Sequence, residues 1–137
     1  MSSKSARCWL SSSLILSGIH SIAWGCFIVL MPTRAAAAYG LAGPPHDLFL
    51  WQGTGLIILL LGTGYLIASS NPLQHWAVVL IGLLAKILGP IGMLVAVMRG
   101  EISANVLWLL PMNDLIWWVP FSIVVFKGIR STTTHNA

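Results

Sequence analysis

Apolar residues gather in four long runs, at about 9–31, 48–69, 73–98 and 106–128, and short polar or proline-containing segments separate them. A helix needs about 20 mostly apolar residues to cross a hydrocarbon layer about 30 Å thick. Lipid offers no hydrogen-bond partner to the backbone, so a spanning segment must be a helix or part of a closed barrel. The pattern therefore predicts an all-α integral membrane bundle of four transmembrane helices, forming a single transmembrane domain over residues 1–137.

The composition agrees with this pattern. Of the 137 residues, 57% are hydrophobic and 7% are charged, whereas soluble domains carry roughly 25% charged residues. The formal charge is +4, but the seven basic residues are scattered singly, six of them near the ends of the runs. Nucleic-acid binding needs a basic cluster or stripe, so we expect the lipid bilayer, and no nucleic acid, as the partner.

The fourth run allows two interpretations, because Pro111 and Pro120 interrupt it. Either the helix begins near residue 106 and bends at Pro111, or residues 106–110 lie in the membrane interface and the helix begins near Met112. We favour the second, because Pro followed by Asn and Asp is typical of a helix start.

The other connections carry helix-start and helix-stop residues. Pro32 ends the first helix, and the alanine-rich stretch after it is expected near the membrane surface. Asp47 can cap the second helix through its carboxylate. In the short connection before the third helix, Asn71 is expected as the cap and Pro72 at the first helical position.

Small residues predict which helices pack closely. The second run is rich in glycine, and the third run has a face of small residues: Gly82, Ala85, Gly89 and Gly92. Such faces let two membrane helices approach each other. We expect the second and third helices to form a tight pair, with a bend at Pro90 in the third.

The positive-inside rule gives an orientation. If the N-terminus is cytoplasmic, that side holds Lys4, Arg7, Lys127 and Arg130, and the other side holds Arg34 and Arg99. Four basic residues against two favour both termini in the cytoplasm.

Three ionisable side chains lie within predicted spans: Lys86, Asp114 and His20. Such groups are costly in lipid, and each is a functional hypothesis by default. Lys86 needs a partner, and Asp114 is the only acid in a span, so we predict a pair between them. The pair either locks two helices together or forms a proton-active or anion-binding site, unless Lys86 reaches a water cavity or a lipid headgroup. His20 is expected to be hydrogen-bonded to a neighbour.

The segment from residue 113 to residue 121 is dense in unusual residues. The side chains that are candidates for binding a flat or amphipathic ligand are Asn113, Asp114, Trp117, Trp118, Gln52 and Tyr65. A quinone is the cofactor considered for such a site. The alternative is a helix cap followed by an aromatic interface belt. No metal site is predicted, because the sequence has no clustered ligands for zinc and no second histidine at the depth of His20 for a haem.

The layout resembles the DoxX-like group of small bacterial membrane proteins. The similarity lies in the Pro-Thr-Arg exit from the first helix, the glycine-rich second helix and the tight Asn-Pro hairpin into the third. The resemblance implies a four-helix membrane bundle that is sometimes associated with quinone-linked redox systems. It also implies a multi-pass protein of the bacterial inner membrane.

Three functions are compatible with the sequence, which contains no soluble-enzyme signature. The first is an accessory or structural subunit, or a helix-bundle module, that associates with a larger membrane complex or with itself. The second is a quinone- or lipid-interacting membrane redox protein with a pocket between the third and fourth helices. The third is a small proton-coupled transporter. We favour the first, which has no catalytic residues of its own.

Overall fold

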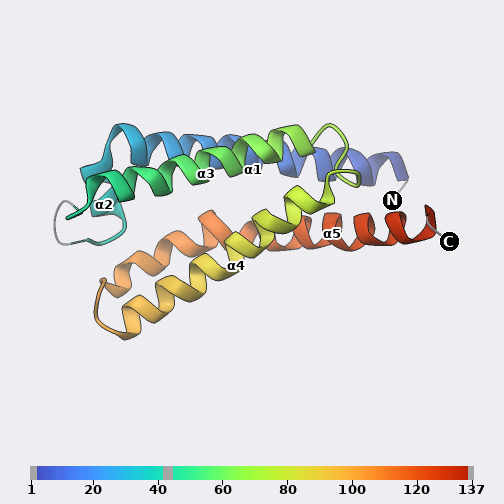
Figure 1. The fold of residues 1–137 in the computed structure, drawn as a ribbon. Coiled ribbons are helices and arrows are strands. Elements are labelled where there is room, and N and C mark those ends of the chain that lie inside the picture. Colours follow the sequence, from blue (N-terminus) through green and yellow to red (C-terminus); the bar gives the residue numbers. More distant parts are fainter. Residues whose placement is uncertain (1–2, 42–44, 136–137) are drawn as a thin grey trace.

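The computed structural model describes residues 3–41 and 45–135, and these form helices joined by short turns (Figure 1). The elements are α1 (Ser3–Leu30), α2 (Pro32–Ala38), α3 (Leu48–Ala68), α4 (Trp76–Met98), the 3₁₀ turn η1 (Ala104–Trp108), the π-helical turn η2 (Pro111–Leu115) and α5 (Ile116–His135). Four stretches are long and apolar enough to cross a membrane: Arg7–Leu30, Leu48–Ala68, Trp76–Met98 and Ala104–Thr133. The expected all-α fold with four candidate spans is confirmed.

The closest helix pair is α1 with α3, not α3 with α4 as the sequence led us to expect. Glycines seven positions apart on each helix face one another, Gly18 opposite Gly62 and Gly25 opposite Gly55. A Cβ on Gly62 would lie 2.8 Å from the carbonyl oxygen of Gly18, so the two backbones touch. The glycines of α3 therefore pack against α1, a pairing that the sequence did not predict.

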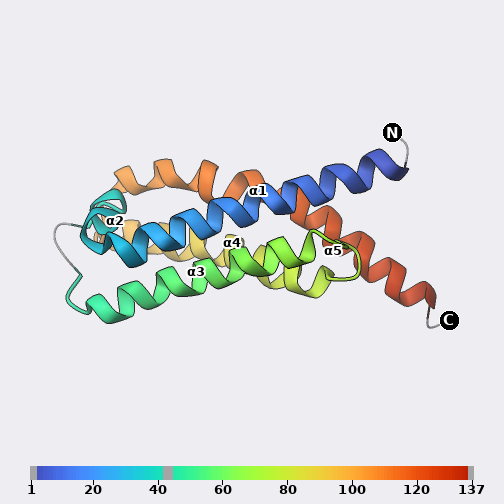
Figure 2. The same ribbon diagram turned by 90° about the horizontal axis from the view of Figure 1, so that it is seen from above.

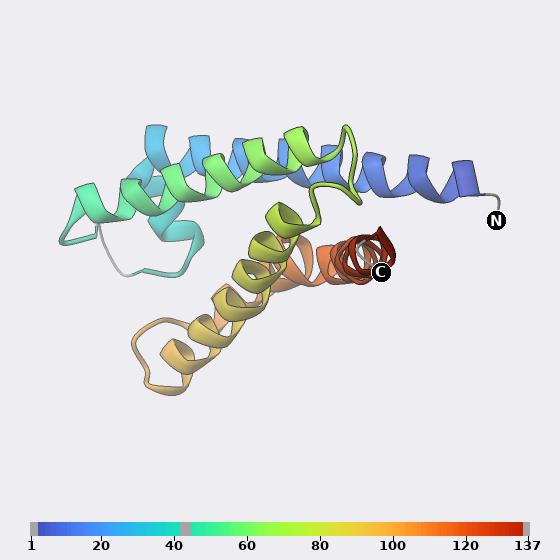
Figure 3. The same cartoon turned by 45° about the vertical axis from the view of Figure 1, so that its right-hand side comes forward.

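The second pair is α4 with α5, and the two pairs diverge from each other (Figure 3). Gly128 of α5 packs directly against the side chain of Trp76 at the start of α4. On α4, Gly82 lies against the ring of Tyr65, but a Cβ on Gly89 or Gly92 would meet nothing within 4 Å. The small-residue face predicted on α4 is therefore only partly used inside the molecule.

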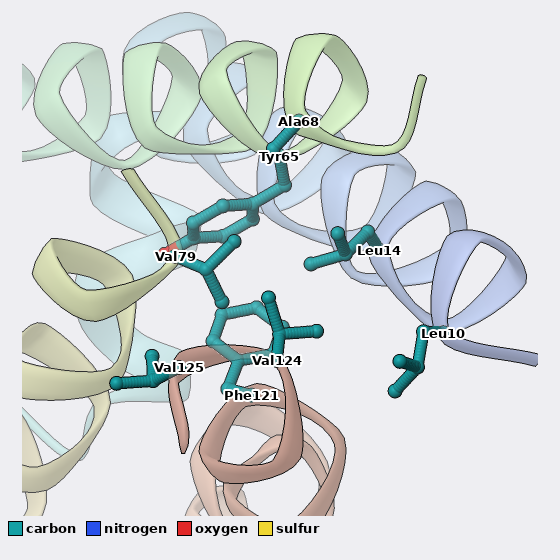
Figure 4. Packing of buried hydrophobic residues seen from close by; sticks show 8 residues of the cluster. All are labelled: Leu10, Leu14, Tyr65, Ala68, Val79, Phe121, Val124 and Val125. Atoms are coloured by element: carbon teal, nitrogen blue, oxygen red, sulfur yellow. The ribbon is translucent and has the colours of Figure 1, made fainter. Parts of the chain in front are cut away.

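A buried apolar cluster joins the two pairs at the end of the bundle that carries both termini (Figures 2 and 4). All four long helices contribute to it: Leu10, Leu14, Tyr65, Ala68, Val79, Phe121, Val124 and Val125. The rings of Tyr65 and Phe121 meet edge to face, with their centres 4.9 Å apart. The pairs are thus joined at one end, which we call the closed end, and spread apart beyond it.

Two helix starts differ in detail from what the sequence predicts. The side chain of Asp47 makes no capping hydrogen bond to α3. The helix after the Asn-Pro connection begins at Trp76, because the backbone oxygen of Asn71 accepts bonds from Gln74 and His75 and holds the intervening residues in a turn. Neither Asn71 as a cap nor Pro72 as a first helical residue was correct.

The fourth span is helical from residue 104 onward, so the preferred start near Met112 was wrong. The chain passes through η1, a short α-helical step and η2 before α5 begins. Proline at the first position of a helical turn loses no hydrogen bond that the turn would otherwise make. Pro111 therefore begins the π-helical turn instead of beginning the helix.

The alanine-rich segment after the first span packs against the long helices. It forms α2, and Ala35 and Ala36 are fully buried. The indole nitrogen of Trp51 donates to the backbone oxygen of Pro32 at 3.0 Å, which ties α2 to α3. The segment is a packed part of the bundle.

Candidate functional site

The site begins at a gap in the hydrogen bonds of α4. Pro90 has no N–H group, so it cannot bond to the backbone oxygen of Lys86, four residues earlier. The indole nitrogen of Trp118 on α5 donates to that oxygen at 2.9 Å. Trp118 thus replaces the missing bond and fixes the backbone of Lys86 against α5.

Asn113, in the π-helical turn, connects three helices. Its backbone oxygen accepts a bond from the Lys86 ammonium at 2.7 Å. Its side-chain oxygen lies 2.9 Å from Nε2 of His20 on α1, whose ring N–H donates in this arrangement. The π-helical turn offsets the backbone of the helix and holds Asn113 where both bonds can form. Such turns are frequent at functional sites.

The predicted pair of Lys86 and Asp114 is brought together, but loosely. The distance between Lys86 Nζ and Asp114 Oδ1 is 3.9 Å, against 2.7 Å to the backbone oxygen of Asn113. Lys86 is 8% exposed. The carboxylate of Asp114 therefore balances the charge of Lys86, while its oxygens keep room for another hydrogen-bond donor.

These polar groups line a pocket of about 250 Å³ between the two helix pairs, which we call the polar pocket. Its polar side chains come from five elements or connections: Ser21, Tyr39, Tyr65, Lys86, Asn113 and Asp114. Its apolar wall comes from α3 and α4: Ile58, Leu61, Ala85, Gly89 and Met93. Polar groups far apart in sequence therefore converge on one space between the two helix pairs.

Tyr39 is the pocket residue that the sequence analysis missed. Gly40, with φ of 73°, ends α2 directly after it, because glycine adopts this left-handed conformation without strain. The hydroxyl accepts a bond from the indole of Trp24 at 2.7 Å, and the ring meets Trp51 edge to face. Burial raises the pKa of the Tyr39 phenol, so it remains a neutral proton donor at physiological pH. A tyrosine just after an alanine-rich helix gave no periodic signal in the sequence.

Three predicted ligand residues lie outside the pocket: Gln52, Trp117 and Trp118. The side chain of Gln52 donates to the backbone oxygen of Val29 at 2.9 Å and joins α3 to α1. The ring of Trp117 packs against His20, with centres 6.0 Å apart, and its buried indole nitrogen has no hydrogen-bond partner among the described residues. Trp118 still affects the pocket, because its bond to the backbone oxygen of Lys86 positions a pocket residue. Within the part of the chain that the structure describes, Gln52 and Trp117 make no such hydrogen bond with a pocket residue.

Together these features define a small polytopic membrane protein with a polar pocket between two helix pairs. Among the residues described, no group of three or more His, Cys, Asp or Glu side chains could hold a metal ion. No family model, no curated protein and no solved structure matches the chain, so no family is assigned.

Proposed function

We propose that this protein binds the polar head of a small amphipathic molecule in the polar pocket. The observation that carries the proposal is the convergence of Lys86, Asp114 and Tyr39 on one pocket from separate elements. Ionisable groups inside a membrane are costly and usually mark a functional site. If the pair of Lys86 and Asp114 only held two helices together, it would need no pocket beside it.

The charges in the pocket favour a neutral head. Lys86 and Asp114 offset each other, so a phosphate would bring a charge that nothing else balances. Lys86 and Tyr39 supply donors, and the Asp114 carboxylate supplies an acceptor. A head group that carries both acceptor oxygens and a hydroxyl proton satisfies them, as in a quinol, the reduced form of a quinone, or in a lipid with a hydroxyl head group.

The size of the pocket limits the ligand to a small head. Its volume is about 250 Å³, below the roughly 300–1,000 Å³ of clefts that enclose drug-sized ligands. One ring or a short polyol fits this space, and a whole membrane lipid does not.

An accessory subunit is the second candidate function. Gly92 on α4 has open space where a side chain would project, and small residues let a helix of another chain approach. A partner subunit that co-purifies with the chain would favour this candidate.

The proposal also includes the placement in the membrane. Both ends of the chain lie at the closed end of the bundle (Figure 1), and we place them in the cytoplasm because four basic residues flank that end against two at the other. We also propose that the chain has the DoxX-like layout and lies in the bacterial inner membrane.

The experiment that tests the proposed function is native mass spectrometry of the protein purified in mild detergent, followed by extraction and identification of the bound molecule. We expect one neutral amphiphile per chain. Lys86→Met should lose it, because the variant keeps the length of the side chain but removes the donor. Lys127→Met is the matched control, because Lys127 is exposed on α5. This variant should retain the ligand.

The joint replacement of Lys86 and Asp114 by leucine separates folding from binding. Loss of one partner leaves the other charge unpaired, which costs about 3–5 kcal/mol at a buried pair, whereas two apolar residues are often tolerated. We expect Lys86→Leu to unfold at a lower temperature than the double variant, and the double variant to fold without binding ligand. A double variant that still carries the amphiphile would contradict the proposal.

A further inference from the structure

A second hollow lies between α3 and α4, and it has a volume of about 220 Å³. We call it the α3–α4 groove. Its lining is wholly apolar: Ile57, Leu60, Leu61, Gly64, Val78 and Ile81. Ile57, Leu60 and Ile81 are each more than half exposed, so the groove opens on the outer, lipid-facing surface of the bundle.

The groove exists because α3 and α4 are not closely packed along this side (Figure 3). Gly64 forms part of its floor, and a Cβ there would lie 3.1 Å from Cγ1 of Val78. A side chain at position 64 would project toward Val78 on α4 and narrow the groove. The missing side chain therefore keeps this surface concave.

The groove and the polar pocket share one wall. Leu61 lines both spaces, and Ile58 of the pocket and Ile57 of the groove are adjacent on the same helix. One space thus has donors, an acceptor and room for a small head, and the neighbouring space has only apolar walls and an opening to lipid.

We propose that the α3–α4 groove holds the apolar chain of the molecule whose head occupies the polar pocket. The ligand class is then a single-chain amphiphile with a neutral, oxygen-bearing head, and its chain passes Leu61 into the groove. This inference rests on the proposed function of the pocket. It adds that the ligand must carry a chain and that the chain leaves between α3 and α4.

The groove selects by shape and not by hydrophobicity. Lipid or detergent is as apolar as the groove, so the chain gains little by transfer from one to the other. A side chain that fills the groove would instead block the path of the chain and keep the head from entering the pocket. A ring without a chain would still fit.

Calorimetric titration in detergent micelles tests this with paired probes, namely a benzoquinol with a decyl chain and the same ring with a methyl group in place of the chain. A monoacylglycerol is the third probe, and it distinguishes a lipid from a quinol as the source of the head group. The test variant is Leu60→Trp, which fills the groove from the exposed side. Leu56→Trp on the same helix is the control, because Leu56 is 50% exposed and lies outside the groove.

We expect Leu60→Trp to weaken binding of the chain-bearing probe by roughly tenfold or more, as overpacking does, and to leave the chainless ring unchanged. Leu56→Trp should leave all affinities unchanged. The groove proposal is overturned if Leu60→Trp leaves the affinity for both ring probes unchanged, or lowers both affinities equally, while Lys86→Met abolishes binding. In that case the proposed function of the polar pocket is retained. If none of the three probes binds to the unmodified protein, both proposals fail.

Discussion

Pro90 and Trp118 show how two single residues position the site. A proline in a membrane helix is tolerated where a neighbour satisfies the freed backbone oxygen, and here that neighbour is an indole on another helix at 2.9 Å. The bond also holds the residue whose side chain enters the pocket. The backbone bond missing at Pro90 and the indole of Trp118 therefore act jointly to position Lys86.

Trp118→Phe should remove this bond and leave the Lys86 oxygen without a partner. We expect a loss of about 1 kcal/mol of unfolding free energy, the usual net value of such a bond. Pro90→Ala restores a backbone N–H in α4, so the same Trp118 substitution should cost less in that background. A double-mutant cycle by thermal unfolding in detergent measures the difference. Equal costs in both backgrounds would show that Trp118 does not replace the proline's missing bond.

At the scale of elements, the packing of α1 on α3 depends on glycines that face each other across the pair. Gly62 and Gly53 lie on the same helix, but only Gly62 contacts α1. Membrane helices associate through close packing and not through the hydrophobic effect. The pairing should therefore be sensitive to a single methyl group at position 62.

Gly62→Ala places a Cβ within 3 Å of backbone atoms on α1, which cannot move aside without separating the helices. We expect a loss of about 1–3 kcal/mol, as in other overpacked sites. Gly53→Ala, with open space around it, should be neutral or raise the unfolding temperature, since alanine favours helix over glycine by about 1 kcal/mol. Similar behaviour of the two variants would rule out this account of the pair.

Pairing was also the feature that the sequence predicted least well. The four spans followed from the length and composition of the runs, and Lys86 and Asp114 were found because charges in such runs are rare. The choice of helix partner was wrong, because Gly18 and Gly25 look ordinary until their spacing is compared with that of Gly55 and Gly62. Tyr39 was missed because its place in the pocket depends on how α2 folds back.

At the scale of the whole molecule, the apolar cluster at the closed end holds the two helix pairs together. Phe121 is fully buried in this cluster against Tyr65, whereas Phe126 on the same helix is 68% exposed. Beyond the cluster the ribbons of the two pairs move apart (Figure 3). The stability of the assembled bundle should thus depend strongly on this one end.

Phe121→Ala should lower the unfolding free energy by about 2 kcal/mol, less than the about 3–5 kcal/mol of soluble cores, because lipid solvates an exposed ring almost as well as the core does. Phe126→Ala should change it little. Circular dichroism should show that helix content survives in both variants, while thermal unfolding separates them. A matching loss in Phe126→Ala would place the joining contacts elsewhere.

The bond from Trp118 to the Lys86 oxygen also constrains how this sequence can diverge. An ordinary residue at position 90 would supply its own N–H and make the indole at 118 dispensable, and loss of the indole first would leave a backbone oxygen unpaired in lipid. Position 90 is therefore free to change first, but position 118 is not free to change while Pro90 remains. In the descendants of this chain, the tryptophan should be kept wherever the proline is kept.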